Sequence, residues 1–70
     1  MTTITVAVQP NTNVAFGIGD SEATARSDAR EWFDGDVATL DVLTIEWTGP
    51  VPTEHTTELG RAIDAARAAR

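Results

Sequence analysis

Two segments in which apolar side chains alternate strictly open the chain, and they limit most of all what it can fold into. Residues 3–9 and residues 14–19 each place an apolar and mostly β-branched side chain at every second position. A period of two puts these side chains on one face of a β-strand. The intervening Pro10-Asn11-Thr12-Asn13 is typical of a turn, so we predict a β-hairpin. Its apolar positions are Ile4, Val6, Val8, Val14, Phe16 and Ile18.

The period changes at Asp20-Ser21, where we predict the start of a helix. Either residue can cap a helix, and Glu22 follows in the first turn, where the helix dipole favours negative charge. Apolar residues then recur on one helix face as far as Asp34-Gly35-Asp36, whose glycine is typical of a helix end. We expect this face to lie in the core, and an aromatic residue that is exposed instead would be the anchor of an interface. The helix face consists of Ala25, Ala29, Trp32 and Phe33.

Residues 40–48 alternate again and predict a third strand, with Leu43, Ile45 and Trp47 on its apolar face. The sequence Gly49-Pro50-Val51-Pro52 ends this strand. A second amphipathic helix follows, with Thr53 as its expected N-cap. The apolar stripe of this helix is Leu59, Ala62, Ile63, Ala66 and Ala69.

The order of elements is therefore ββαβα. A crossover from the second strand to the third, passing over the first, gives an antiparallel sheet with strand order 2-1-3. We expect both helices on one face of this sheet. The length suits a single acidic α+β domain over residues 1–70.

The net charge of −6 is confined to the middle of the chain. Residues 20–46 carry eight acids and two arginines, which accounts for all of it, whereas residues 54–70 sum to zero. The chain contains no lysine, and such a charge repels nucleic acid and favours a basic partner. The alternative is a surface that only keeps the protein soluble. The candidate partner-binding residues are Asp28, Glu31, Asp34, Asp36, Asp41 and Glu46.

Three of these acids, Asp28, Glu31 and Asp34, follow one another at a spacing of three on the predicted helix. Neighbouring carboxylates on a helix lie about 5–6 Å apart, which is similar to the spacing of phosphates along a nucleic-acid strand. Such a surface can occupy an arginine- and lysine-lined groove that evolved for DNA or RNA. We expect the charge to keep the chain monomeric, although an open edge of a three-stranded sheet is a ready site for self-pairing.

The sequence offers no catalytic or metal-binding apparatus. Without cysteine, thiol-based redox chemistry and a cysteine zinc site are excluded. His55, the one histidine, could share a divalent ion with Glu54 and Glu58, but a lone histidine among surface carboxylates is usually solvated. The junction Gly17-Ile18-Gly19 lacks the third glycine and the lysine of phosphate-binding loops. We therefore expect no enzyme activity, no cofactor and no bound metal.

The segment Gly17-Ile18-Gly19-Asp20-Ser21-Glu22-Ala23-Thr24-Ala25, continued by Asp28-Ala29, resembles the strand-to-helix junction of HicB-type antitoxins. In those proteins a G-D-S/T turn starts an alanine-rich helix. The junction is also similar to that of double-stranded-RNA-binding domains, whose phosphate-gripping lysines are absent here, so we expect no direct binding of nucleic acid. As an alternative function, the HicB resemblance implies a module that neutralises a small ribonuclease toxin.

In its overall format the chain resembles the small anti-CRISPR proteins of phages. These are lone acidic domains without cysteine, and several are proposed to mimic DNA and block target recognition by type I effector complexes. Type I-C inhibitors include members of this description. The resemblance implies a non-enzymatic inhibitor with a type I CRISPR effector complex as its partner. No signal peptide or long apolar run is evident, so we expect the protein in the bacterial cytoplasm, away from membranes.

Overall fold

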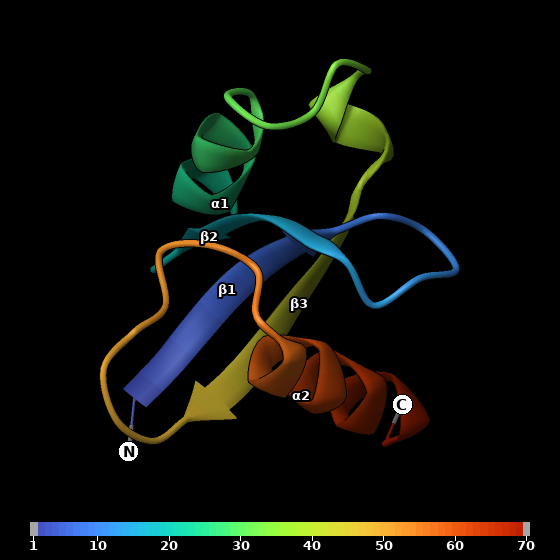
Figure 1. Cartoon of the computed structure of the whole chain (residues 1–70). Helices are drawn as coiled ribbons and strands as arrows, with labels where there is room; N and C mark the ends of the chain where they lie inside the picture. Colours follow the sequence, from blue (N-terminus) through green and yellow to red (C-terminus); the bar gives the residue numbers. More distant parts are fainter. Residues whose placement is uncertain (1, 70) are drawn as a thin grey trace.

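Residues 2–69 are described by the computed structural model, which contains three strands, two α-helices and one 3-10 turn (Figure 1). The elements follow the order ββαβα that the sequence predicts, with the 3-10 turn η1 inserted before the third strand. Their bounds are β1 Thr2–Val8, β2 Ala15–Gly19, α1 Glu22–Ala29, η1 Val37–Thr39, β3 Asp41–Trp47 and α2 Thr57–Ala68.

The strands form one antiparallel sheet in the order β2-β1-β3, which confirms the predicted topology. Between β1 and β3 the register is unbroken, from Thr2 opposite Trp47 to Val8 opposite Asp41. Between β1 and β2 it shifts, because Ala7 and Val8 face Gly17 and Ala15 and leave Phe16 as an extra residue. This irregularity is a β-bulge, a feature that bends and twists the strand that carries it.

The two helices cover opposite faces of the sheet, so the prediction that both lie on one face is wrong (Figure 1). On one face Val6 and Val8 belong to the same core cluster as Leu59 and Ile63 of α2. On the other face Ala7 clusters with alanines of α1. The alternation in residues 3–9 predicts one buried face, but Thr5 and Ala7 on the other face are buried as well. The second face is small rather than polar, and small residues also admit a helix.

Gly17 lets α1 approach the hairpin closely. A Cβ atom at this position would collide with the carbonyl oxygen of Ala25 and lie 2.7 Å from the backbone nitrogen of Ala29. Both alanines are fully buried, and Thr5 beside them on β1 is only 7% exposed. The contact between α1 and β2 is therefore made by backbone and methyl groups, which requires a glycine opposite the helix. Val37, Leu40, Phe16 and Phe33 complete this second core cluster.

Helix α1 ends at Ala29, five residues before the predicted end near Asp34. The amides of Glu31 and Trp32 bond to carbonyls three residues earlier, which marks a tightening last turn. Beyond it the chain bends so that the ring of Phe33 packs on Phe16, with their centroids 4.9 Å apart. Trp32 consequently points outward and is 59% exposed, so the prediction that it lies in the core is wrong.

Helix α2 begins three residues later than predicted, because Thr56 rather than Thr53 caps it. The Thr56 side chain accepts a hydrogen bond from the Leu59 amide at 3.1 Å. Leu59 and Ile63 are fully buried as expected, whereas Ala69 at the end of the predicted stripe is exposed. Residues 48–56 thus form a longer connection than predicted. Trp47, the last residue of β3, packs partly on the core and donates its indole N–H to the carbonyl of Pro50 in this connection.

We expect Gly17→Ala to destabilise the protein by about 2 kcal/mol, because the added methyl group pushes α1 away from β2. Urea unfolding monitored by circular dichroism measures this. Gly49→Ala is the control, since no atom lies within 4 Å of the site and only its positive φ of 93° opposes a side chain. It should cost about 1 kcal/mol. Equal losses for the two variants would contradict the role given to Gly17.

Candidate functional site

The placement of the helices turns the uneven charge of the sequence into two different faces. Residues 20–40, which include α1 and η1, carry six acids and two arginines. Glu46 of β3 is directed to the same side of the sheet as α1, because its neighbour Ile45 belongs to the core under α2. On the opposite face, α2 carries two acids and two arginines. The negative charge therefore concentrates on the α1 face, which we define as residues 20–40 together with Glu46.

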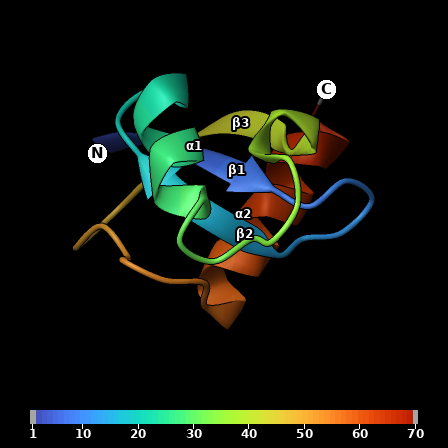
Figure 2. The same cartoon turned by 90° about the horizontal axis from the view of Figure 1, so that it is seen from above.

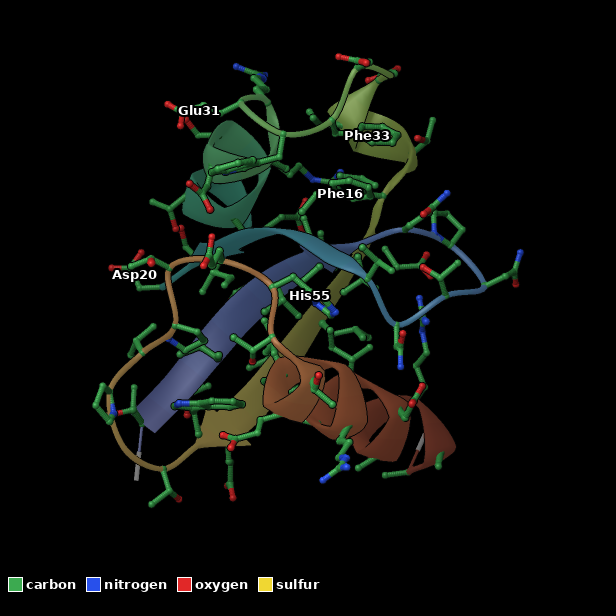
Figure 3. The ribbon with its side chains drawn as sticks, viewed as in Figure 1. Phe16, Asp20, Glu31, Phe33 and His55 are labelled. Atoms are coloured by element: carbon green, nitrogen blue, oxygen red, sulfur yellow. The ribbon has the colours of Figure 1, made fainter. Side chains whose placement is uncertain are left out.

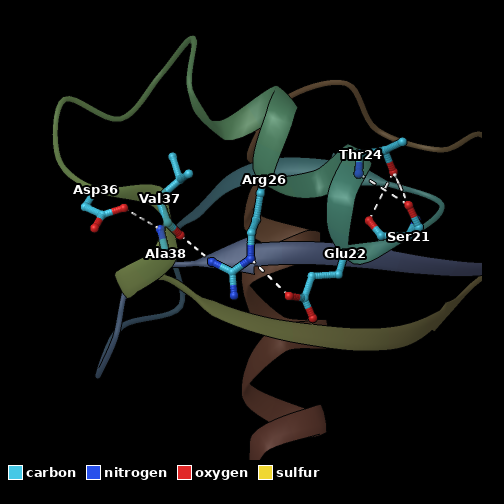
Figure 4. Close-up of polar contacts among 7 residues, drawn as sticks. All are labelled: Ser21, Glu22, Thr24, Arg26, Asp36, Val37 and Ala38. Carbon is cyan, nitrogen blue, oxygen red and sulfur yellow. Dashed lines mark hydrogen bonds and ion pairs between the residues drawn. The ribbon is translucent and has the colours of Figure 1, made fainter.

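Arg26, one of the two arginines of this face, is engaged within the fold (Figure 4). Its Nε donates to Glu22 Oε2 at 3.2 Å and its Nη1 donates to the Val37 carbonyl, so that it joins α1 to η1. Arg30 is exposed. Arg26 thus compensates the charge of Glu22. No arginine forms an ion pair with Glu31, Asp34 or Glu46 within residues 2–69.

Three of the six predicted partner-binding residues make hydrogen bonds or ion pairs within the fold. Asp28 Oδ2 accepts from the Ile18 amide at 3.0 Å, and Asp36 Oδ1 accepts from the Ala38 amide at 2.9 Å as the cap of η1. Asp41 Oδ2 pairs with Arg67 Nη2 at 3.0 Å, which ties the start of β3 to the end of α2. One oxygen of each of these carboxylates is therefore engaged by a partner within the fold.

The other three, Glu31, Asp34 and Glu46, are exposed and make no hydrogen bond or ion pair within residues 2–69. They do not continue a helical row from Asp28. Glu31 lies in the turn that ends α1, Asp34 in the loop after it and Glu46 on β3. Figure 3 shows Glu31 at the end of α1 that is far from the sheet. The evenly spaced row is therefore wrong, because α1 stops at Ala29. Glu46 lies opposite Thr3 near the end of β3, and Figure 1 shows that end far from the loop that follows α1, so the structure does not bring Glu46 together with Glu31 and Asp34.

A shallow apolar groove runs along the outer side of β2, between α1 and the connection before α2. It consists of two hollows of about 400 and 300 Å³ that share Ile18, Asp28 and Thr53. Val51 lines the first hollow and Trp32 the second. Within residues 2–69 these are the two large apolar side chains that are exposed, at 47% and 59%. The groove places an exposed aromatic ring next to Glu31 on the α1 face.

Sequence reasoning missed this groove because it placed Trp32 in the core and Thr53 at a helix end. The signal that could have revealed it is the charged pair Arg30-Glu31 directly before Trp32, followed by Asp34-Gly35-Asp36. Such a segment favours an early end of the helix. If the helix ends early, Trp32 no longer lies on its apolar face and can be exposed.

His55 has a structural contact in this region (Figure 3). Its Nδ1 accepts a hydrogen bond from the Ala15 amide at 3.2 Å, which fastens the connection before α2 to the first residue of β2. Within residues 2–69 no group of three His, Cys, Asp or Glu side chains is arranged to hold a metal ion, and this includes the set with Glu54 and Glu58. His55 therefore positions the backbone here.

We expect Asp28→Ala to lower the free energy of unfolding by about 1.5 kcal/mol, because the outward amide of Ile18 loses its acceptor. Asp28→Asn removes the same charge but retains an oxygen that can accept, so it should cost less than half as much. Glu31→Ala, at an exposed position without a partner, should change the value by less than about 0.5 kcal/mol. Equal losses for Asp28→Ala and Asp28→Asn would show that charge, not the hydrogen bond, matters.

No helix within residues 2–69 combines the length and the apolar character needed to cross a membrane. Comparison of the chain with known protein families, with curated proteins and with solved structures finds no match. The charge, the groove and the contacts within residues 2–69 are therefore the features from which a function can be inferred.

Proposed function

We propose that this protein is a non-enzymatic inhibitor whose α1 face binds the basic nucleic-acid-binding groove of a larger complex. The observation that supports this most directly is the segregation of charge between the two faces of the sheet. A surface of one sign attracts a partner of the opposite sign and discourages like-charged ones, over a range of about 10 Å at 0.1 M salt. Charge confined to one face also orients the protein as it approaches.

The contact surface that we propose centres on Glu31 and Asp34, and Glu46 adds negative charge farther along the same side of the sheet. The carboxylates of these three acids have no partner within residues 2–69. Asp28 and Asp36 contribute at its margin while they keep their structural bonds. Asp41 is paired with Arg67 on the α2 side of the sheet and is outside this surface. Trp32 supplies an apolar anchor beside Glu31. Interfaces obtain most of their affinity from a few such aromatic residues, while surrounding charges govern the rate and specificity of association.

Within this class, the proposed mechanism is mimicry of DNA in the target-binding groove of a type I CRISPR effector complex, as the resemblance to small anti-CRISPR proteins implies. The alternative is a HicB-like antitoxin module that neutralises a small ribonuclease toxin. It is favoured by the junction Gly19-Asp20-Ser21, where Ser21 and Thr24 cap each other's backbone amides (Figure 4). Both proposals use the same acidic face, and the identity of the captured partner distinguishes them.

We expect the double variant Glu31→Lys/Asp34→Lys to lose inhibition of target-DNA binding by a purified type I effector complex. Fluorescently labelled DNA and increasing amounts of the protein measure this. The matched control is Glu58→Lys/Asp64→Lys on α2, which changes the net charge equally outside the α1 face and the groove and should inhibit like the native chain. Circular dichroism checks that both variants fold.

Equal loss in the two double variants would mean that total charge, rather than the α1 face, is responsible. No inhibition by the native protein would exclude the CRISPR partner. Capture of a basic ribonuclease, with relief of its toxicity in cells, would then establish the antitoxin alternative. If neither partner is bound, the acidic face serves only solubility and the proposed function is wrong.

We expect Trp32→Ala to weaken partner binding by about 2 kcal/mol while changing the free energy of unfolding by less than about 1 kcal/mol, because the ring is mostly exposed. Isothermal titration against the partner and urea unfolding measure the two values. Val51→Ala, at the other end of the groove, is the matched control and should leave affinity unchanged. A larger effect on stability than on binding would show that Trp32 is part of the core.

A further inference from the structure

The two edges of the sheet are treated differently by the rest of the chain. At the β2 edge, the amides of Ala15 and Ile18 are directed away from β1 and both are occupied. His55 Nδ1 accepts from the first at 3.2 Å and Asp28 Oδ2 from the second at 3.0 Å. Side chains of residues 51–55 also line the groove along this strand. The β2 edge is therefore closed to another strand.

The hydrogen bond of the Ile18 amide to Asp28 also determines which amides of β3 are directed outward. Since the Ile18 amide is directed away from β1, the residue opposite it, Val6, directs its own N–H and C=O toward β3. Leu43 is opposite Val6 and therefore faces β1. By alternation, Val42, Thr44 and Glu46 direct their amides outward, where nothing within residues 2–69 accepts from them.

β3 has few of the features that protect an exposed edge strand, which are proline, charged side chains, a bulge or a covering segment. Asp41–Trp47 contains neither proline nor lysine, and its pairing with β1 has no irregularity. Its two charged residues are Asp41, which is paired with Arg67, and Glu46. Figure 2 shows β3 at one margin of the molecule, while the connection before α2 passes on the opposite side near β2. The longer edge strand of the sheet is thus the less protected one.

We propose that β3 pairs antiparallel with β3 of a second copy of this chain, about a two-fold axis between the two Thr44 residues. In this register Thr44 faces the partner's Thr44, and Val42 faces the partner's Glu46. On the other face Leu43 lies opposite the partner's Ile45. No two like charges are directly opposed, and threonine pairs of this kind stabilise a sheet. Leu43 and Ile45 are already buried in each chain, so the pairing rests on backbone hydrogen bonds and on the threonines. The result is one continuous six-stranded sheet.

The axis of such a pair is perpendicular to the sheet, so both α1 helices lie on one face of the dimer. This joins two acidic faces into one larger surface. The repulsion between two chains of charge −6 opposes association and is the reason why the sequence alone predicts a monomer. Salt screens that repulsion, whereas backbone hydrogen bonds are little affected. The dimer should therefore become tighter, not weaker, as the salt concentration rises.

Sedimentation velocity of the full chain over a range of concentrations, at 0.05 and 0.5 M salt (values on either side of the physiological one), tests this directly. We expect a dimer that tightens with salt. Thr44→Lys, which opposes two like charges on the axis, should raise the dissociation constant about tenfold, and mixing it with Thr44→Glu should restore association. Val42→Lys, placed opposite the partner's Glu46, should lower the constant by about the same factor. Ser27→Lys on α1 changes the charge equally and should have only the small effect of net charge.

A native chain that stays monomeric at both salt concentrations would overturn the proposal. So would a dimer that Thr44→Lys and Ser27→Lys affect equally, because its interface would lie elsewhere. Weakening by Val42→Lys would exclude this register. Circular dichroism of each variant separates loss of pairing from loss of folding. The measurement uses no other protein, so its outcome is independent of the proposed inhibitor function.

Discussion

The contact between α1 and the hairpin is the constraint on which the rest of the structure depends. Gly17 leaves room for the backbone of Ala25 and Ala29 to pass close to β2. The small side chain of Ala7 packs against α1 beside it. With α1 seated there, the larger Ile and Val residues of β1 remain for α2 on the opposite face. A chain of 70 residues without disulfides thus obtains two small cores from one strand whose faces differ in side-chain size.

This division between the faces also organises the charge. The acidic residues follow α1 in the sequence, so they are carried to the face that α1 covers, while the balanced segment of α2 occupies the other. The charge distribution along the chain becomes a distribution in space only because the helices are on opposite sides. Had both helices covered one face, as the sequence suggested, acids and arginines would have been mixed in a single layer.

The acids of this face have two kinds of environment. Asp28 closes the β2 edge and Asp36 caps η1, so these positions tolerate a charge change only if the hydrogen-bond acceptor is kept. Glu31, Asp34 and Glu46 make no such bonds to other residues within the range 2–69 and are exposed to a partner. The distinction matters for any mutational study of the surface, because reversing Asp28 disturbs the fold and the charge together. The hydrogen bond of Asp28 to the Ile18 amide also closes the β2 edge of the sheet, and the outward amides of β3 have no such acceptor within residues 2–69.

The sequence by itself determined the elements that local periodicity encodes. The alternation in residues 3–9 and 40–48 predicts the strands, and the strand order follows from the rule for crossovers. The uneven charge is likewise a property of the sequence. Only the tertiary structure decided which face each helix covers, where α1 ends, and that Trp32 is exposed. These depend on contacts between distant residues, such as Gly17 with Ala29 and Phe16 with Phe33, whose fit in three dimensions no local pattern contains.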